Sequence, residues 1–195
     1  MLKVQSGWLK GMKLKLATDD ATLRPTSHRA RAATMDRLRS RLSGARFLDL
    51  FAGTGAVGFE ALSQGADIVV LVEKNRALGK AIRETIGLCE TRAKNQGLPH
   101  PHIVLIASDV QAAWSAVDKH GPFDLVWIDP PYALVKQWAS DNKARLKSLL
   151  EAGACLIVES DGEGQMALQD IFAGFPLDSR KYGSTFITVI EALND

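Results

Sequence analysis

The sequence predicts a doubly wound α/β domain with a mostly parallel seven-stranded sheet that ends in an antiparallel hairpin. From residue 46 onward, short apolar runs typical of buried strands alternate with segments of helical length. Such alternation is typical of a parallel sheet with helices on both faces. The last two strands, at 177–182 and 185–191, are separated only by Gly183-Ser184, and a two-residue link permits only antiparallel pairing.

Each element of this fold follows from its local pattern. Apolar runs that end at polar residues, glycine or proline predict the strands, and the longer segments between them predict the helices. The expected strands are 46–51, 68–73, 103–108, 123–129, 154–159, 177–182 and 185–191. The expected helices are 27–42, 57–63, 76–95, 110–120 and 135–150. Thr26 or Ser27 is a suitable capping residue for the first helix.

The first 22 residues predict a small β-hairpin ahead of this domain. Two short strand-like runs, at 2–5 and 12–16, flank a glycine-containing turn. Trp8 in that turn either packs against the domain or stacks on a nucleic-acid base. We therefore divide the chain into a hairpin extension at 1–22 and a main domain at 23–195.

Positive charge is concentrated at the start of the chain. Residues 1–46 hold 11 Lys and Arg against 3 Asp and Glu, a net charge of +8, whereas residues 47–195 have a net charge of −6. This asymmetry favours a surface that binds nucleic-acid phosphates over a merely solvated helix face.

The remaining composition is typical of a cytoplasmic protein without a metal site. No apolar run approaches the ~20 residues needed to cross a membrane, and the N-terminus lacks the apolar segment of a signal peptide. Cys89 and Cys155 are far apart and form no zinc-binding pair. The Pro-His-Pro-His segment at 99–102 lacks an acidic partner, which favours a surface loop over a metal site.

A glycine-rich turn follows the first strand of the predicted sheet. Gly53, Gly55 and Gly58 match the pattern G-x-G-x-x-G, and Glu73 ends the next strand 20 residues after Gly53. In dinucleotide-binding turns, glycines allow close backbone approach and the acid binds ribose hydroxyls. An NAD-dependent oxidoreductase is therefore one interpretation.

Two further acids favour a cationic cofactor. Asp49 lies four residues before Gly53, where its charge would repel a pyrophosphate but attract a cation, and Asp109 ends the third strand. S-adenosylmethionine fits these features, because it carries a sulfonium, an ammonium group and adenosine. We expect Asp49 to face the ammonium group, and Gly53 with Gly55 to face the amino-acid part. Glu73 then lies at the ribose and Asp109 at the adenine amine.

The sequence Asp-Pro-Pro-Tyr at 129–132 follows the fourth strand and suits methyl transfer to an amino group. The Asp129 carboxylate and the Pro130 carbonyl can each accept one N–H from the exocyclic amine of a base, which orients the lone pair of the nitrogen. An ordinary pKa near ~4 would keep Asp129 ionised at neutral pH. Tyr132 is placed to stack on the base. A strand followed by a simple proline turn is the alternative interpretation.

These stretches resemble a known group of enzymes. The segments at 49–55 and 129–132 resemble those of Rossmann-like, S-adenosylmethionine-dependent amino-methyltransferases, which methylate adenine amines in DNA and guanine amines in RNA. The segments at 7–14, 24–29 and 181–183 narrow the resemblance to the RsmD family, the 16S rRNA guanine-N2 methyltransferases of bacteria.

The resemblance implies methyl transfer from S-adenosylmethionine to the N2 amine of a guanine in 16S ribosomal RNA, by a monomer acting on an assembling small subunit. A DNA adenine-N6 methyltransferase and a non-enzymatic ribosome-assembly factor remain alternatives. The expected catalytic residues are Asp129, Pro130 and Tyr132. The expected cofactor-binding residues are Asp49, Phe51, Gly53, Gly55, Glu73, Lys74, Asp109, Val110, Arg24 and Thr26. We expect the extension at 1–22 to bind RNA. The expected nucleic-acid-binding residues are Lys10, Lys13, Arg24, Arg29, Arg31 and Lys181.

Overall fold

The computed structural model describes residues 2–17 and 25–193 of the chain, and only the backbone of residues 25–29. Its centre is a seven-stranded sheet in the order β3-β2-β1-β4-β5-β7-β6. The strands are β1 Arg46–Asp49, β2 Ile68–Val72, β3 His102–Ile106, β4 Leu125–Ile128, β5 Cys155–Ser160, β6 Leu177–Tyr182 and β7 Thr185–Ile190. Strands β1 to β5 pair with one another in parallel, whereas β7 is antiparallel to both β5 and β6. The predicted fold class is confirmed.

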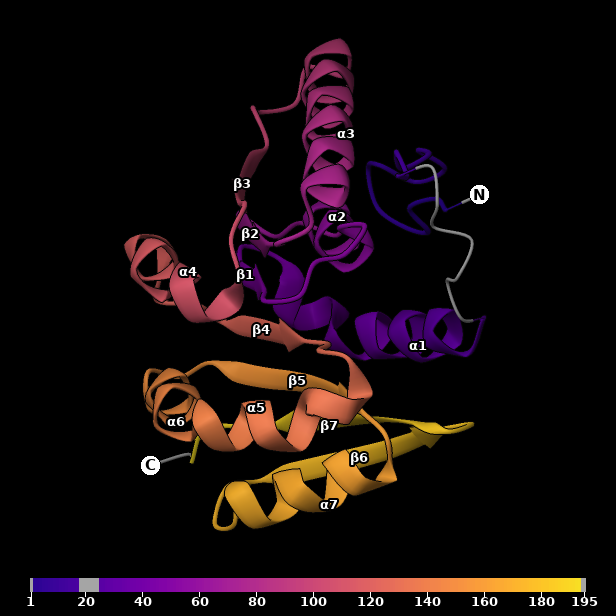
Figure 1. Ribbon diagram of the computed structural model, residues 1–195. Helices are drawn as coiled ribbons and strands as arrows, with labels where there is room; N and C mark the ends of the chain where they lie inside the picture. Colours follow the sequence, from indigo (N-terminus) through magenta and orange to yellow (C-terminus); the bar gives the residue numbers. More distant parts are fainter. Residues whose placement is uncertain (1, 18–24, 194–195) are drawn as a thin grey trace.

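Helices cover both faces of this sheet (Figure 1). They are α1 Pro25–Leu42, α2 Ala56–Ser63, α3 Arg76–Asn95, α4 Val110–Val117, α5 Val135–Asp141, α6 Lys143–Glu151 and α7 Gly162–Ile171, with short 3-10 turns η1 Asp118–His120 and η2 Tyr132–Leu134. Because successive strand residues point to opposite faces, Phe47 enters the core with Leu42 of α1 and Ile82 of α3. Leu48 enters the other core, with Leu146 of α6.

The expected single helix at 135–150 is wrong, because the chain breaks at Asn142 into α5 and α6. Asn142 has φ −102° and ψ 9°, outside the usual helical region. Its side chain donates to the Trp138 carbonyl over 2.8 Å and accepts from Trp114 Nε1 over 3.3 Å. An asparagine that bonds to nearby backbone in this way competes with helix continuation.

Helix α7 has no counterpart among the expected elements. Asp161 caps its first turn by accepting the Gly164 N–H over 2.8 Å. Gly162 and Gly164 have weak helix propensity, and this hid the helix in the sequence. Gly164 is required by packing, since a Cβ there would lie 2.9 Å from Ser160 Cβ and 3.0 Å from Val135 Cγ1.

The N-terminal segment forms a short antiparallel pairing without the two regular strands that we expected. The Val4 N–H donates to the Met12 carbonyl and the Leu14 N–H donates to the Leu2 carbonyl, both over 3.0 Å. All four side chains are buried in the core that α1 and α2 also enter. The predicted division of the chain at residue 22 lies outside the described residues.

Glu60 of α2 holds the turn of this N-terminal segment. Its carboxylate accepts the Gln5 N–H over 2.8 Å and the Ser6 N–H over 3.0 Å. Trp8 Nε1 donates to the Leu62 carbonyl over 3.1 Å, and the Trp8 ring packs against the core. Of the two interpretations of Trp8, the structure therefore shows packing.

Within residues 2–17 and 25–193, no group of three or more His, Cys, Asp and Glu side chains is arranged to hold a metal ion. The Pro-His-Pro-His segment begins in the loop between α3 and β3, and its last residue, His102, starts β3. None of the helices in the same ranges is both long enough and apolar enough to cross a membrane.

Candidate active site

A cavity of about 770 Å³ opens at the carboxyl ends of the parallel strands. Open α/β sheets bind ligands at this edge, where the strand order reverses between β1 and β4. Segments that follow β1, β2, β3 and β4, together with the end of β5, line the cavity. The predicted site residues that it brings together are Arg31, Phe51, Gly53, Glu73, Lys74, Asp109, Val110, Asp129, Pro130 and Tyr132.

The glycine turn after β1 is held by the carboxylate of Glu73, directly after β2. The Gly53 N–H donates to Glu73 Oε2 over 2.7 Å, and the Asn75 N–H donates to Glu73 Oε1 over 2.6 Å. Gly53 has φ +55°, a left-handed conformation that glycine adopts without steric cost. An ionised carboxylate accepts about four hydrogen bonds, so these two bonds are compatible with further bonds to ligand hydroxyls.

Asp49 and Gly55 stand behind the cavity wall and do not line it. Asp49 is 1% exposed and accepts the Phe51 N–H over 3.3 Å. Burial raises the pKa of Asp49 to about 7, while the Phe51 hydrogen bond and the Arg31 charge oppose the shift. Gly55 has φ +75°, and a Cβ there would lie 2.7 Å from Phe59 Cε2, so this glycine keeps the turn tight against α2.

The lining of the cavity combines charged and aromatic groups. Lys74 Nζ lies 3.4 Å from Asp109 Oδ2 in an exposed ion pair. Asp109 also caps α4, because its Oδ1 accepts the Gln111 N–H over 3.0 Å. Phe51 packs edge-on against Trp138, with ring centroids 5.1 Å apart. An apolar wall with a few polar groups is typical of a nucleoside-binding pocket.

Asp129 follows β4 and lies in the cavity, where its ionisation is strongly perturbed. The pKa of Asp129 is raised to about 8, mainly by burial and also by the nearby carboxyl of Glu159, while the Arg31 charge opposes the shift. The expected ordinary pKa near ~4 is therefore wrong, because the sequence does not show how deeply the strand end is buried. A pKa in this range allows Asp129 to bind or release a proton near neutral pH, which is typical of groups that accept or donate protons in active sites.

Glu159, near the end of β5, is a cavity residue that the sequence analysis did not identify. The residue is 2% exposed, and its Oε1 accepts a hydrogen bond from the Tyr132 hydroxyl over 2.9 Å. The same hydroxyl lies 2.7 Å from Thr185 Oγ1. The signal in the sequence was an acid directly after the apolar run 154–158, the same pattern that marked Glu73.

The predicted nucleic-acid contacts lie at separate places. Arg31 of α1 lines the main cavity and also a neighbouring cavity of about 430 Å³, which Lys10 lines too. The backbone of Lys13 pairs with that of Lys3 in an isolated antiparallel β-bridge of the N-terminal segment. Lys181 of β6 places its Nζ 5.5 Å from the centre of the Phe186 ring. The side chains of Arg24, Thr26 and Arg29 lie outside the described part of the chain.

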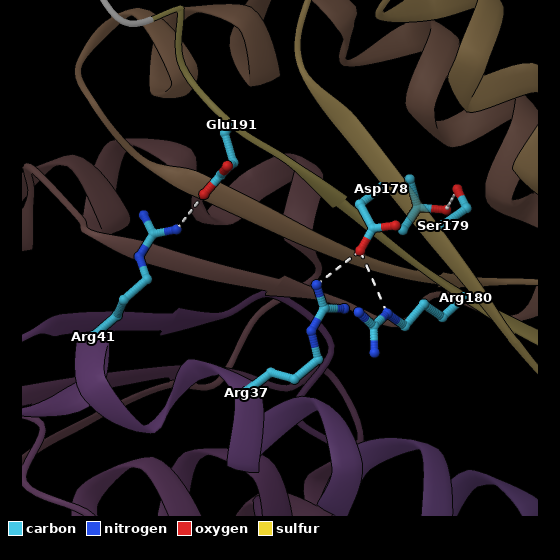
Figure 2. A network of polar contacts seen from close by, with 7 residues as sticks. Arg37, Arg41, Asp178, Ser179, Arg180 and Glu191 are labelled. Carbon is cyan, nitrogen blue, oxygen red and sulfur yellow. Dashed lines mark hydrogen bonds and ion pairs between the residues drawn. The ribbon is translucent and has the colours of Figure 1, made fainter.

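Two ion pairs fix α1 to the antiparallel edge of the sheet (Figure 2). An Arg37 nitrogen lies 2.7 Å from Asp178 Oδ2, and an Arg41 nitrogen lies 2.5 Å from Glu191 Oε1. The hydrogen bond from Arg37, with the charge of Arg180 nearby, holds the pKa of Asp178 below its ordinary value. Because α1 also carries Arg31, these pairs help to place that guanidinium at the cavity.

A solved structure described as "Putative methyltransferase yhhF from Escherichia coli" has this fold. It covers 98% of this chain and 99% of its own, with a TM-score of 0.72 and 26% identity. The shared sheet, with its last strand inserted antiparallel beside β5, is the methyltransferase form of the Rossmann-like fold. Together with the glycine turn and the Asp-Pro-Pro-Tyr turn in one cavity, it defines the chain as an S-adenosylmethionine-dependent methyltransferase.

Comparison with protein families makes the assignment more specific. The chain belongs to the family described as "Conserved hypothetical protein 95", which matches residues 2–191. "Ribosomal RNA small subunit methyltransferase D" of Buchnera aphidicola is 30% identical over 146 residues, which are 73% of this chain and 71% of that protein. "Putative rRNA methyltransferase YlbH" of Bacillus subtilis is 27% identical over 166 residues, 85% of each chain.

Proposed function

We propose that the chain transfers a methyl group from S-adenosylmethionine to the exocyclic N2 amine of a guanine in 16S ribosomal RNA, as a member of the RsmD group. The observation that carries this proposal is the Asp-Pro-Pro-Tyr turn, which faces the same cavity as the glycine turn and Glu73. The names of two relatives, one of them specific to the small ribosomal subunit, support ribosomal RNA as the substrate.

The residues of the cavity fit S-adenosylmethionine. Glu73 offers acceptors for the ribose hydroxyls, and Asp109 offers one for the adenine amine. Phe51 and Val110 supply apolar surface for the adenine ring. When bound, the cofactor supplies an electrophilic methyl group on a positively charged sulfur. Asp129 lines the cavity and Asp49 lies buried behind its wall; burial raises the pKa of both carboxyls, and a bound cation would favour their ionised forms.

The turn at 129–132 acts on the guanine. Asp129 and the Pro130 carbonyl each accept one N–H of the exocyclic amine, so the nitrogen lone pair points at the methyl group. The ionised Asp129 also stabilises the positive charge that develops on the nitrogen. Since its pKa lies in the neutral range, Asp129 is suited to take the proton that the methylated amine then loses. Tyr132 stacks on the base.

Labelled S-adenosylmethionine tests this function directly. The protein is incubated with naked 16S RNA, assembled small subunits or DNA, and the labelled nucleosides are analysed. We expect label in N2-methylguanosine from one of the RNA samples. Label in N6-methyladenine from DNA would support the adenine methyltransferase instead. No transfer, with ribosome assembly still supported by an Asp129→Ala protein, would indicate an assembly factor. Tight NADH binding without S-adenosylmethionine binding would indicate an oxidoreductase.

A further inference from the structure

Glu159 lies beside Asp129 at the carboxyl ends of two neighbouring parallel strands. Ile128, the last residue of β4, pairs with Val158 of β5; Asp129 directly follows β4, and Glu159 is the next residue of β5. Adjacent strands are about 4.8 Å apart, and residues in register point to the same face. Both residues line the main cavity, and the Glu159 carboxyl is close enough to Asp129 to raise its pKa.

A chain of hydroxyl groups fixes the Glu159 carboxylate in place. The Tyr132 hydroxyl donates to Glu159 Oε1 over 2.9 Å, and Thr185 Oγ1 lies 2.7 Å from the Tyr132 oxygen. Burial raises the pKa of Tyr132 to about 12, so the phenol keeps its proton and remains a donor to Glu159. Thr185 then donates to the Tyr132 oxygen. An ionised carboxylate accepts about four hydrogen bonds, so this arrangement orients Glu159 and is compatible with a donor from a ligand.

Two neighbouring carboxyl groups in a cavity are suited to bind a ligand with two adjacent hydrogen-bond donors along one edge. Guanine has such an edge, because its ring N1–H lies next to the exocyclic N2 amine. Adenine carries an amine next to a ring N1 that has a lone pair and no hydrogen. A carboxylate facing that N1 would place two acceptors against each other, and unpaired buried polar groups are costly.

We propose that Glu159 makes the site selective for guanine, by accepting the N1–H of the base whose N2 amine is held by Asp129 and Pro130. This inference rests on the proposed function and adds to it the residue that distinguishes guanine from adenine. A site built to bind a donor rejects analogues that lack the donor far more strongly than an apolar site does.

The base 2-aminopurine tests this role, because it retains the exocyclic amine of guanine but has a lone pair at N1. A synthetic RNA containing the methylated guanine is made with guanine or 2-aminopurine at that single position. For the wild-type protein, we expect kcat/KM for the guanine RNA to exceed that for the 2-aminopurine RNA by about 10- to 100-fold. Equal kcat/KM values would overturn the inference without any variant being needed.

The variant Glu159→Gln then assigns the selectivity to this residue. Its amide keeps the size of Glu159 and can donate to N1 of 2-aminopurine, so the ratio of the two kcat/KM values should fall towards about one. A merely structural role would lower both values together and leave the ratio unchanged, which would overturn the inference. Glu163→Gln on α7, whose carboxylate forms an exposed pair with Lys136 over 3.3 Å, is the matched control and should keep the wild-type ratio.

The same measurements distinguish a failure of this inference from a failure of the proposed function. If the wild-type protein methylates the guanine RNA but shows no preference over 2-aminopurine, guanine-N2 methylation stands and the role of Glu159 is wrong. If the wild-type protein methylates no guanine in any RNA or subunit sample, both are wrong. Binding of S-adenosylhomocysteine by calorimetry shows that Glu159→Gln keeps a folded cofactor site, with an expected change of less than about threefold, which is under 1 kcal/mol.

Discussion

The backbone N–H of Gly53 donates to the carboxylate of Glu73 over 2.7 Å, and this bond joins the ends of β1 and β2 at the cavity. Two features that the sequence places 20 residues apart therefore form one unit. The acid expected to bind the ribose also holds the turn that approaches the cofactor. Loss of Glu73 should weaken cofactor binding both through the missing contact and through a less ordered turn.

Glu73→Ala should weaken S-adenosylmethionine binding about 10- to 150-fold, which corresponds to about 1.5–3 kcal/mol for a lost charge-assisted hydrogen-bond pair. Isothermal titration calorimetry measures this change. Glu84→Ala, on the exposed side of α3, removes the same charge away from the cavity and should leave the affinity unchanged. Wild-type affinity in a folded Glu73→Ala protein would show that the ribose lies elsewhere.

The sequence alone was sufficient to predict the sheet and most of the cavity residues at the carboxyl ends of its parallel strands. Strand ends carry a distinct local signal, since an acid or a proline follows an apolar run at Glu73 and Asp129. The same signal at Glu159 was missed, because its role depends on strand pairing: β5 neighbours β4, and only this pairing puts Glu159 in the cavity.

Burial and helix breaks depend on tertiary contacts, and they were predicted least well. Asp49 was expected at the cofactor surface, yet it lies one layer behind that surface. At the break at Asn142, a local bond to the Trp138 carbonyl combines with a hydrogen bond from Trp114, which is 28 residues away in the sequence. Neither the burial of Asp49 nor the Trp114 contact has a local pattern, so single-sequence reasoning had no signal for them.

Methyl transfer should depend on the ionisation of Asp129. Because the pKa of Asp129 is raised to about 8, the carboxyl is increasingly protonated as the pH falls below that value, and it then loses acceptor capacity for the amine. The groups that act on it are Glu159 and Asp49, which raise the pKa, and Arg31, which lowers it. We expect kcat/KM to rise with pH up to about 8 and then level off.

Asp129→Asn should lower kcat by at least about 10²-fold, the effect seen for lost electrostatic stabilisation, and should abolish this pH dependence. Its affinity for S-adenosylmethionine should change little. Steady-state rates between pH 6 and 9.5 provide the measurement. A wild-type rate for Asp129→Asn, or a product with its methyl group on a ring carbon, would contradict the role given to Asp129.

Lys10 should contribute to RNA binding through phosphate contact. Lys10 lines the 430 Å³ cavity beside Arg31, in the part of the chain that has a net charge of +8. Lys10→Glu should reduce the slope of log affinity against log salt by about 0.7–0.9 for each lost phosphate contact. Filter binding of 16S RNA at several salt concentrations measures the slope.

Lys143→Glu on α6, on the other face of the sheet, is the matched control for this charge reversal and should keep the wild-type slope. A point variant is a cleaner test than removal of residues 1–22, since Leu2, Val4 and Leu14 are part of the hydrophobic core. An unchanged slope for Lys10→Glu would place the RNA on a different surface.

Asp49 should make the stability of the protein fall as the pH rises. Its pKa is raised from 3.8 to about 7, mainly by burial, so the folded state binds more protons than the unfolded state between these two values. The free energy of unfolding therefore decreases with rising pH across this window, by at most about 1.4 kcal/mol per pH unit from this one group. Above pH about 7 the contribution is fully lost, because Asp49 is then ionised in both states.

Asp49→Asn removes the titrating group while keeping its shape, so its stability should be less dependent on pH. Relative to wild type, the free energy of unfolding of Asp49→Asn should increase by about 2–3 kcal/mol between pH 5 and pH 8. Urea unfolding of the ligand-free proteins at these two pH values measures the difference. Asp170→Asn, at an exposed position of α7, is the control and should follow the wild-type pH dependence. Parallel pH profiles for wild type and Asp49→Asn would show that the Asp49 carboxyl is solvated in solution.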